Sequence, residues 1–232
     1  MIEHLPASAY TAPSGVYYED LFALHPLFDK LAFNANLILV GPKGIGKSLS
    51  FASWADKNSV PLITFDCSED TRRSNLVGTF VLRGDQTPFV LGALTTAFEV
   101  ANEVGSCILD LEEINALTPQ VQKLLNGPLD FRRSVEVPEA KHVFRLKPEA
   151  KLWIVGTMNM TVYGGVYQLN EDLKSRLRLL NVTYPTKDQE AAILKQAAPG
   201  LDKRTLDSVL MLGTETRQAG AVEYSLSTRD LV

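Results

Sequence analysis

The segment Gly41–Ser48, GPKGIGKS, constrains the fold of this chain more than any other feature. It matches the pattern G-x-x-x-x-G-K-S/T and lies between a short apolar run, LILV, and a segment with helical spacing. In this frame the glycines let the backbone wrap its N–H groups around phosphate oxygens, and the N-terminus of the next helix adds a positive potential. The pattern therefore predicts a phosphate-binding loop that joins a buried strand to a helix.

Each residue type in the loop has a chemical task at such a site. Lys47 offers a point charge to the β- and γ-phosphates of a nucleotide, and the Ser48 hydroxyl is a ligand for Mg²⁺. The other expected nucleotide-binding residues are Gly41, Pro42, Lys43, Gly44, Ile45, Gly46 and Leu49. ATPases and P-loop kinases share this loop, so the second half of the site has to distinguish them.

Strands and helices alternate along most of the chain, which indicates βαβ units and a parallel sheet between two layers of helices. Apolar runs predict five strands, at residues 36–40, 61–67, 106–111, 151–159 and 179–184. Helical patterns are found at residues 17–33, 47–57, 92–104, 118–127 and 170–177. The fourth of these helices is expected to have Thr118 at its N-cap, Pro119 in its first turn and Gly127 just past its end.

Two segments depart from this alternation. Residues 132–147 predict a β-hairpin inserted before the fourth strand, with its turn at Pro138–Ala140. After the fifth strand the pattern is helical only, and Thr186–Gln189 forms a capping box that opens the first of these helices. We therefore expect a core over residues 1–184, followed by a small, partial helical lid over residues 185–232.

Acidic residues gather at the end of the third strand, in CILDLEEIN. Hydrolysis needs one carboxylate for the Mg²⁺ shell and another to polarise the attacking water. Strand register favours Glu112 for the Mg²⁺ shell and Glu113, on the opposite face, as the general base. Asp110 shares the face of Glu112, and it either pairs with a Lys or Arg or is itself the carboxylate on the metal side. A solvated acidic strand end is the alternative interpretation.

Two further polar residues extend this hypothesis. Asn159 ends the fourth strand, and a strand inserted between the loop strand and the acidic strand would aim it at the γ-phosphate and its water. Arg176 lies at the end of a short helix, from which an arginine at a subunit edge reaches the γ-phosphate of a neighbour. By spacing alone, a turn asparagine and a helix C-terminal arginine remain alternatives, and the second is the stronger of the two. A kinase would explain neither Asn159 nor the inserted hairpin.

The order GPKGIGKS, LEEIN, GTMN, LNEDLKSRL and LSTR resembles that of AAA+ ATPases over about residues 21–229. It is most similar to the MoxR, CbbQ/NirQ and dynein-related (McrB-like) branch. The resemblance implies an α/β fold, a P-loop NTPase sandwich of three layers with a five-stranded parallel sheet, and ATP and Mg²⁺ as ligands. The roles it implies are Walker A for Gly41–Ser48, Walker B for Glu112 and Glu113, sensor 1 for Asn159, the arginine finger for Arg176 and sensor 2 for Arg229.

The resemblance also implies partners. Such proteins act as hexameric rings in which each site is completed by the neighbouring subunit, and they remodel or activate a client protein. The hairpin at 132–147 is similar to the pre-sensor hairpin of that branch, and residues 75–92 match an insert that lines the pore. The segment Tyr17–Asp20 either covers the adenine or packs on the core. This chain departs from the pattern at Glu112, where the family has Asp, and it stops three residues after Arg229.

Composition limits the remaining classes of function. A net charge of −4 provides no global field that attracts nucleic acid, although Arg72 and Arg73 form a short basic spot. No apolar run reaches the length of a membrane span, and the N-terminus is unlike a secretory signal. The two cysteines, Cys67 and Cys107, are expected to be reduced thiols in the core of a cytoplasmic protein.

Three hypotheses for function remain at this stage. The first is an ATP-driven remodeller of a partner protein, working as a homo-oligomeric ring. The second is a nucleotide-gated assembly module with little turnover, which Glu112 favours because its longer side chain changes the reach to Mg²⁺. The third is a motor subunit of a nuclease or defence complex that acts on DNA and uses ATP or GTP.

Overall fold

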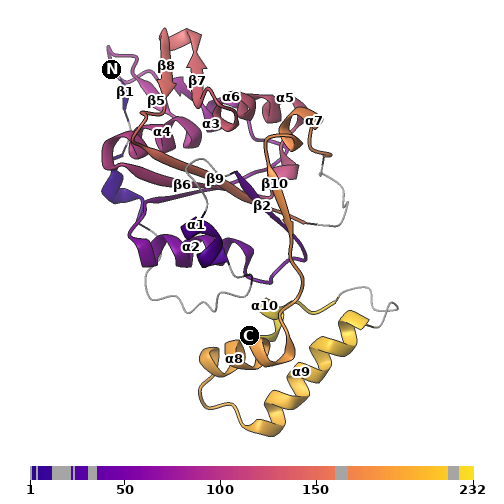
Figure 1. Cartoon of the computed structure of the whole chain (residues 1–232). Helices are drawn as coiled ribbons and strands as arrows, with labels where there is room; N and C mark the ends of the chain where they lie inside the picture. Colours follow the sequence, from indigo (N-terminus) through magenta and orange to yellow (C-terminus); the bar gives the residue numbers. More distant parts are fainter. Residues whose placement is uncertain are drawn as a thin grey trace.

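The structure of this chain, a computed structural model, describes residues 2–3, 5–11, 22, 24–30, 36–159, 167–218 and 225–232. Its centre is a five-stranded parallel sheet with helices on both faces (Figure 1), which confirms the predicted fold class. In spatial order the strands are β10 (Arg178–Asn181), β2 (Leu37–Val40), β9 (Lys151–Met158), β6 (Ser106–Glu112) and β3 (Leu62–Asp66).

Strand β9 lies between β2, which leads into the phosphate-binding loop, and the acidic strand β6, as the sequence predicts. Val155 of β9 pairs with Leu37 on one side and with Asp110 on the other. Because the three strands are parallel, their carboxyl ends meet at one edge of the sheet. This register brings the loop after β2, Asn159 after β9 and Glu112 at the end of β6 to the same edge.

Two apolar clusters fill the space between the sheet and its helices, one on each face. Helices α1 (Leu24–Lys30) and α2 (Lys47–Asn58) cover one face, where Trp54 and Trp153 pack edge to face with ring centroids 5.3 Å apart. Helix α4 (Ala93–Val104) covers the other face. The three central strands β2, β9 and β6 are buried on both faces, which explains why their sequences are mostly continuous apolar runs rather than alternating ones.

The helical segment after β6 extends beyond its predicted end. It runs through α5 (Pro119–Gln122), a 3-10 turn (Lys123–Leu125) and α6 (Asn126–Leu129). Gly127 therefore lies inside α6, and the prediction that it follows the helix end is wrong. A Cβ at Gly127 would lie 2.8 Å from the carbonyl oxygen of Ser134, so the glycine permits close approach of the next strand.

Two β-hairpins lie outside the main sheet (Figure 1). The hairpin predicted at 132–147 consists of the antiparallel strands β7 (Ser134–Val137) and β8 (His142–Arg145), with a 3-10 turn at Pro138–Ala140 between them. The other falls in the insert at 75–92. Its two antiparallel strands are β4 (Gly78–Phe80) and β5 (Phe89–Leu91). The short strand β1 (Ile2–Glu3), from the N-terminal segment, pairs in parallel with β5.

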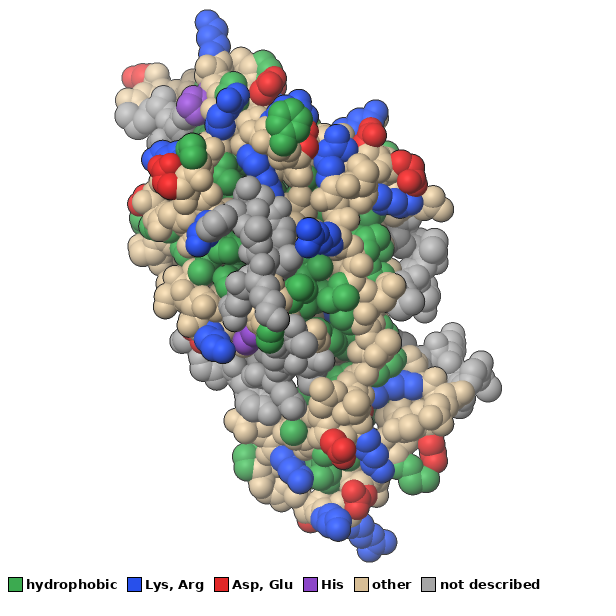
Figure 2. Space-filling model, in the orientation of Figure 1, with side chains coloured by type: hydrophobic (Ala, Val, Ile, Leu, Met, Phe, Trp, Pro, Cys, Tyr) green, Lys and Arg blue, Asp and Glu red, His purple; other side chains and the backbone are tan. Residues whose placement is uncertain are grey.

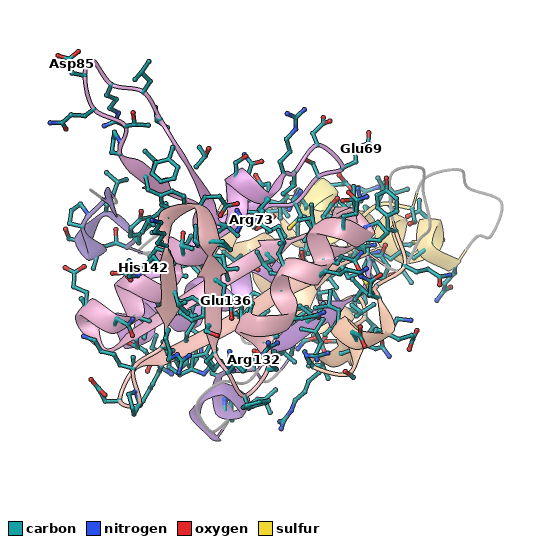
Figure 3. The ribbon with its side chains drawn as sticks, turned by 90° about the horizontal axis from the view of Figure 1, so that it is seen from above. Glu69, Arg73, Asp85, Arg132, Glu136 and His142 are labelled. Atoms are coloured by element: carbon teal, nitrogen blue, oxygen red, sulfur yellow. The ribbon has the colours of Figure 1, made fainter. Side chains whose placement is uncertain are left out.

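Helix α3 (Arg73–Leu76) links the two hairpins. The Arg73 guanidinium forms an ion pair with Glu139 at 3.0 Å and donates to the Glu136 carbonyl oxygen at 3.4 Å. Figure 3 shows Asp85 at the far tip of the projecting β4–β5 hairpin. The basic spot predicted at Arg72 and Arg73 thus makes a contact within the chain.

The segment after β10 is helical, as predicted. Helix α8 (Lys187–Ala197) opens with the capping box, in which the Thr186 hydroxyl accepts from the Gln189 backbone N–H. Helices α9 (Lys203–Gln218) and α10 (Thr228–Leu231) follow, and the three form a group below the sheet in Figure 1. The buried residues of their own small apolar cluster are Leu194, Leu206 and Leu210.

The surface carries charges of both signs. On the face seen in Figure 2, Lys and Arg side chains are interspersed with Asp and Glu rather than gathered into one patch. The described residues on that face therefore show no continuous basic track for a nucleic-acid backbone. Within the described residues, no helix combines the length and the apolar character that crossing a membrane requires.

Candidate functional site

A cavity of about 590 Å³ lies at the carboxyl edge of the sheet, where α8 and α10 face the core. The phosphate-binding loop and the first turn of α2 line it with residues 43–49. The strand ends contribute Glu112, Glu113 and Asn159, and α10 contributes Arg229. The structure thus brings most of the residues that the sequence singled out into one cavity.

The glycines of the loop meet different physical requirements. Gly44 and Gly46 have left-handed backbones, with φ of 70° and 91°, which other residues adopt at a cost. Gly41 instead permits close packing, because a Cβ there would lie 2.4 Å from the carbonyl oxygen of Val182. A Cβ at Gly44 would also lie 2.3 Å from Ser227 Oγ, so this glycine lets the start of α10 rest on the loop.

Lys47 is buried and its ammonium group has three oxygen partners. It donates to the carbonyl oxygens of Gly41 at 2.9 Å and Pro42 at 2.6 Å, and to Asn159 Oδ1 at 3.2 Å. Burial lowers the pKa of Lys47 to about 8, and the nearby charge of Glu113 opposes this shift. Gly41 and Pro42 therefore contribute to the site through their backbone carbonyl oxygens, which hold the Lys47 side chain across the loop.

Glu113 and Asn159 are joined by a hydrogen bond. Asn159 Nδ2 donates to Glu113 Oε1 at 3.0 Å, and the exposed Lys43 ammonium lies 3.5 Å from the same oxygen. The Glu113 backbone has φ of 52°, and its N–H donates to Thr157 Oγ1 at 3.1 Å. Strand alternation, the argument used to orient Glu113, does not apply, because β6 ends at Glu112 and a left-handed turn directs the next side chain.

Of the acidic residues in β6, Glu112 lines the cavity and Asp110 is buried in the sheet. Asp110 Oδ1 has no hydrogen-bond partner among the described residues, and burial, with repulsion from Glu112 and Asp66, raises the pKa of this carboxyl well above its usual range. Asp110 makes no ion pair among the described residues and does not line the cavity, so the structure supports neither of its two predicted roles.

The oxygen groups of Ser48 and Glu112 line the same cavity, as a Mg²⁺ site requires. Mg²⁺ prefers oxygen ligands, and in nucleotide sites it takes one or two from the protein and the rest from phosphates and water. Among the described residues, no group of three or more His, Cys, Asp or Glu side chains could hold a metal alone. These two residues therefore fit an ion that is bound together with a nucleotide.

Arg229 belongs to α10, which packs directly on the phosphate-binding loop. Its backbone N–H donates to the Gly44 carbonyl oxygen at 3.0 Å, and its side chain lines the cavity. The Ser227 hydroxyl accepts from the Asp230 N–H and caps this helix. The position of Arg229 is compatible with the predicted sensor 2.

Arg176 is the predicted site residue that the structure leaves apart. It follows α7 (Glu171–Lys174), its guanidinium donates to the Asp172 carbonyl oxygen, and it is not among the described residues that line the cavity.

Sequence reasoning missed several residues that line the cavity. They are Thr157 at the end of β9, Ile193 of α8, Thr228 of α10 and the terminal Val232. For Thr157 a signal existed, because it lies two residues before Asn159 and so on the same side of the strand. The lid residues had none, since only packing of the lid brings them to the loop. The predicted adenine cover, Tyr17–Asp20, lies outside the described residues.

Comparison with known proteins adds a family to this geometry. A family model described as "AAA domain (dynein-related subfamily)" matches residues 36–177. The chain is 26% identical over 234 residues to an uncharacterized protein of Staphylococcus epidermidis, covering 97% of this chain and 84% of that one. It is 28% identical over 232 residues to the uncharacterized protein YojN of Bacillus subtilis, covering 94% of this chain and 74% of YojN.

A solved structure shares the fold. It is described as the crystal structure of "a putative ATPase" from Cytophaga hutchinsonii, and it superimposes with a TM-score of 0.59 at 16% identity. The match covers 84% of this chain but only 58% of that one.

Proposed function

This chain belongs to the AAA domain family, dynein-related subfamily, and we propose that it works as a ring-forming P-loop ATPase that remodels or activates a partner protein. In this proposal, ATP binds in the cavity between the core, residues 1–184, and the lid, residues 185–232. Hydrolysis takes place at contacts between subunits, and the ring is a hexamer. The buried free thiols Cys67 and Cys107 support a cytoplasmic setting.

One observation carries the proposal: Lys47, Asn159 and Glu113 form a continuous hydrogen-bonded row in a single cavity. In such a row the lysine marks where phosphate charge is held. The asparagine lies next to it, and the carboxylate lies beyond. This order is that of a site in which a water is activated beside a terminal phosphate.

The roles of the individual residues follow from that order. The loop N–H groups, Lys47 and Arg229 bind the phosphates, and Ser48 and Glu112 hold Mg²⁺, which neutralises phosphate charge when bound. Glu113 accepts a proton from the attacking water, and its exposed side chain leaves room for that water. Asn159 already donates to Glu113 and is placed to orient the same water.

The position of Arg176 supports the proposal that the chain assembles into a ring. It is not among the described residues that line the cavity of its own chain, and its guanidinium bonds to the Asp172 carbonyl oxygen. In many NTPases, an arginine from a second subunit stabilises the charge that develops on the transferred phosphoryl group. Each copy would therefore complete the site of the next, and hydrolysis would depend on assembly.

A second candidate is a nucleotide-gated assembly module with slow turnover. The observation that favours it is the Glu112–Glu113 pair, because a glutamate in place of an aspartate holds Mg²⁺ at a different reach. In that case ATP binding alone would control the formation of the ring. The same protein and the same assay distinguish the two candidates.

The test is steady-state hydrolysis of ATP and GTP at increasing protein concentration. We expect the rate per subunit to rise with concentration. Glu113→Gln should lower the rate by about 10²–10⁴-fold and leave nucleotide binding intact, because only the base is lost. Arg176→Ala should lower it by at least about 10³-fold. Arg178→Ala, an exposed arginine two residues further on, is the matched control and should have little effect.

The opposite results are equally informative. A wild-type chain that binds ATP but shows no turnover at any concentration would exclude the remodeller and leave the assembly module. A rate per subunit that is independent of concentration, together with an active Arg176→Ala variant, would exclude a shared site.

A further inference from the structure

The short helix α7 carries Arg176 at its C-terminal end and cannot hold its own position. It has only four residues, far fewer than an isolated helix needs to be stable in water. Its main apolar anchor is Leu173, which is fully buried. The guanidinium of Arg176 bonds within this segment, to the Asp172 carbonyl oxygen, but the position of the whole segment must be set by contacts from other parts of the fold.

Gln122 holds the start of this helix. It lies in α5, and its side chain is completely buried. Its Oε1 accepts from the backbone N–H of Asn170, the N-cap of α7, at 2.8 Å. Its Nε2 donates to the Leu117 carbonyl oxygen at 2.9 Å. Both ends of one buried amide are thus used to join α7 to the segment that follows β6.

Asn36 holds the end of the same helix. It is buried at the start of β2, and its Nδ2 donates to the carbonyl oxygen of Arg176 itself at 3.0 Å. The same group donates to the Leu129 carbonyl oxygen at 2.9 Å. The contact to Leu129 is buried and the contact to Arg176 is partly buried, so loss of Asn36 would leave at least one buried carbonyl without its donor, which is costly.

We propose that Gln122 and Asn36 are positioning residues that hold Arg176 in the direction needed to reach the nucleotide of a neighbouring copy. The inference rests on the proposed function, in which Arg176 acts between subunits. Gln122 also joins α7 to the segment that follows the proposed base, because Leu117 lies only four residues after Glu113.

Mixed assemblies test this proposal. One chain carries Arg176→Ala, so that its own site is intact but it offers no arginine. The other carries Glu113→Gln, so that it offers the arginine but cannot hydrolyse ATP. Equimolar mixing should restore turnover at contacts between the two. Gln122→Met, which keeps the length of the side chain and removes its hydrogen bonds, is then added to one chain or to the other.

The expected result is an asymmetry between the two placements. In the chain that offers Arg176, Gln122→Met should lower the restored rate by about 10–100-fold, as a small misplacement of a reacting group does. In the chain that lacks the arginine, the rate should change by less than about twofold. Asn36→Leu should give the same asymmetry independently. Gln120→Met, on the exposed side of α5, is the matched control and should change neither mixture.

The outcomes separate the two levels of inference. If the parent mixture restores turnover but both placements of Gln122→Met lower it equally, or neither does, the positioning role is overturned and the shared site stands. If the parent mixture restores nothing, the shared site itself is wrong, and the positioning role fails with it. ATP affinity and thermal melting of each variant report whether it is folded.

Discussion

The ammonium group of Lys47 donates hydrogen bonds to three oxygen atoms of the protein. Two loop carbonyl oxygens and Asn159 Oδ1 accept its hydrogen bonds, and Glu113 is the nearby charge that most favours its protonated form. Burial outweighs this attraction, and Lys43 and Arg229 add repulsion, so the pKa falls to about 8. A phosphate bound in the loop would add negative charge beside this ammonium group and favour its protonated form.

We therefore expect ATP binding to be coupled to proton uptake near pH 8.5. The phosphates raise the pKa of Lys47 again, so a fraction of neutral lysine takes up a proton on binding, and affinity declines as the pH rises above about 8. Titration calorimetry in two buffers with different ionisation enthalpies measures the uptake. It should be small at pH 6.5 and absent in Lys47→Met. Wild-type binding without proton uptake at pH 8.5 would contradict the shift.

The lowered pKa of Lys47 also makes the stability of the fold depend on pH. Its folded pKa of about 8 lies below the ordinary value of 10.5, so between these values the unfolded chain binds the proton first. The contribution of Lys47 to the free energy of unfolding therefore decreases as the pH falls from about 10.5 to about 8.

The three helices of the lid are joined at the buried carboxylate of Glu190, which accepts hydrogen bonds from α9 and α10. Arg217 of α9 makes two hydrogen bonds of 2.9 Å to Glu190 of α8, and the exposed fractions of the two side chains are 11% and 3%. Thr228 of α10 donates to the same carboxylate at 2.6 Å. The guanidinium also lies 4.1 Å from the centre of the Tyr184 ring, at the junction with the core. This network positions α10 against the phosphate-binding loop.

Removing one member of this pair should destabilise the lid strongly. Arg217→Met leaves the Glu190 carboxylate buried without its partner, and we expect a loss of about 3–5 kcal/mol in the free energy of unfolding. The double variant Arg217→Met with Glu190→Leu should lose less, because no buried charge remains. Urea denaturation followed by circular dichroism measures both.

The control for this comparison is the exposed pair between Arg73 and Glu139. Arg73→Met should change the free energy of unfolding by at most about 1 kcal/mol, because solvent screens that pair. Equal losses for Arg217→Met and Arg73→Met would mean that burial of the lid pair is unimportant.

In the molecule as a whole, Phe131 marks the surface that carries Arg176. It lies in the turn after α6 with 94% of its surface exposed, between Asp130 and Arg132. A hydrogen bond from Arg132, and more weakly the charge of Arg176, lower the pKa of Asp130, so these side chains share one region. Because aromatic residues are enriched at contacts between subunits, Phe131 is the residue of this region to test for a contact with a neighbouring copy.

We expect Phe131→Ser to weaken assembly without affecting the site. The protein concentration at half-maximal ATPase rate should rise by about tenfold, because loss of an aromatic interface anchor commonly costs more than about 1 kcal/mol. The ATP affinity should remain unchanged. Leu82→Ser, at another exposed apolar residue, is the control. An unchanged concentration dependence would place the contact between copies elsewhere on the surface.

Reasoning from the sequence was sound where the signal was local. Continuous apolar runs identified the five strands, and the Thr186 capping box and the turn at Pro138–Ala140 lie where short-range patterns indicated. It was wrong at Gly127, where a glycine that resembles a helix stop instead permits close approach of a strand. A glycine that ends a helix and a glycine that permits close packing look the same in the sequence. At Gly127 only the nearby carbonyl oxygen of Ser134 shows which role applies.

The sequence by itself determined the phosphate-binding loop, the parallel sheet and the residue types at the strand ends, because each depends on neighbours within a few positions. Tertiary structure decided the left-handed turn that directs Glu113, the burial that raises the pKa of Asp110 and lowers that of Lys47, and the buried amides that hold α7. These properties arise from desolvation and from contacts between segments far apart in the chain. No pattern along the chain encodes them, since they exist only once the segments pack together.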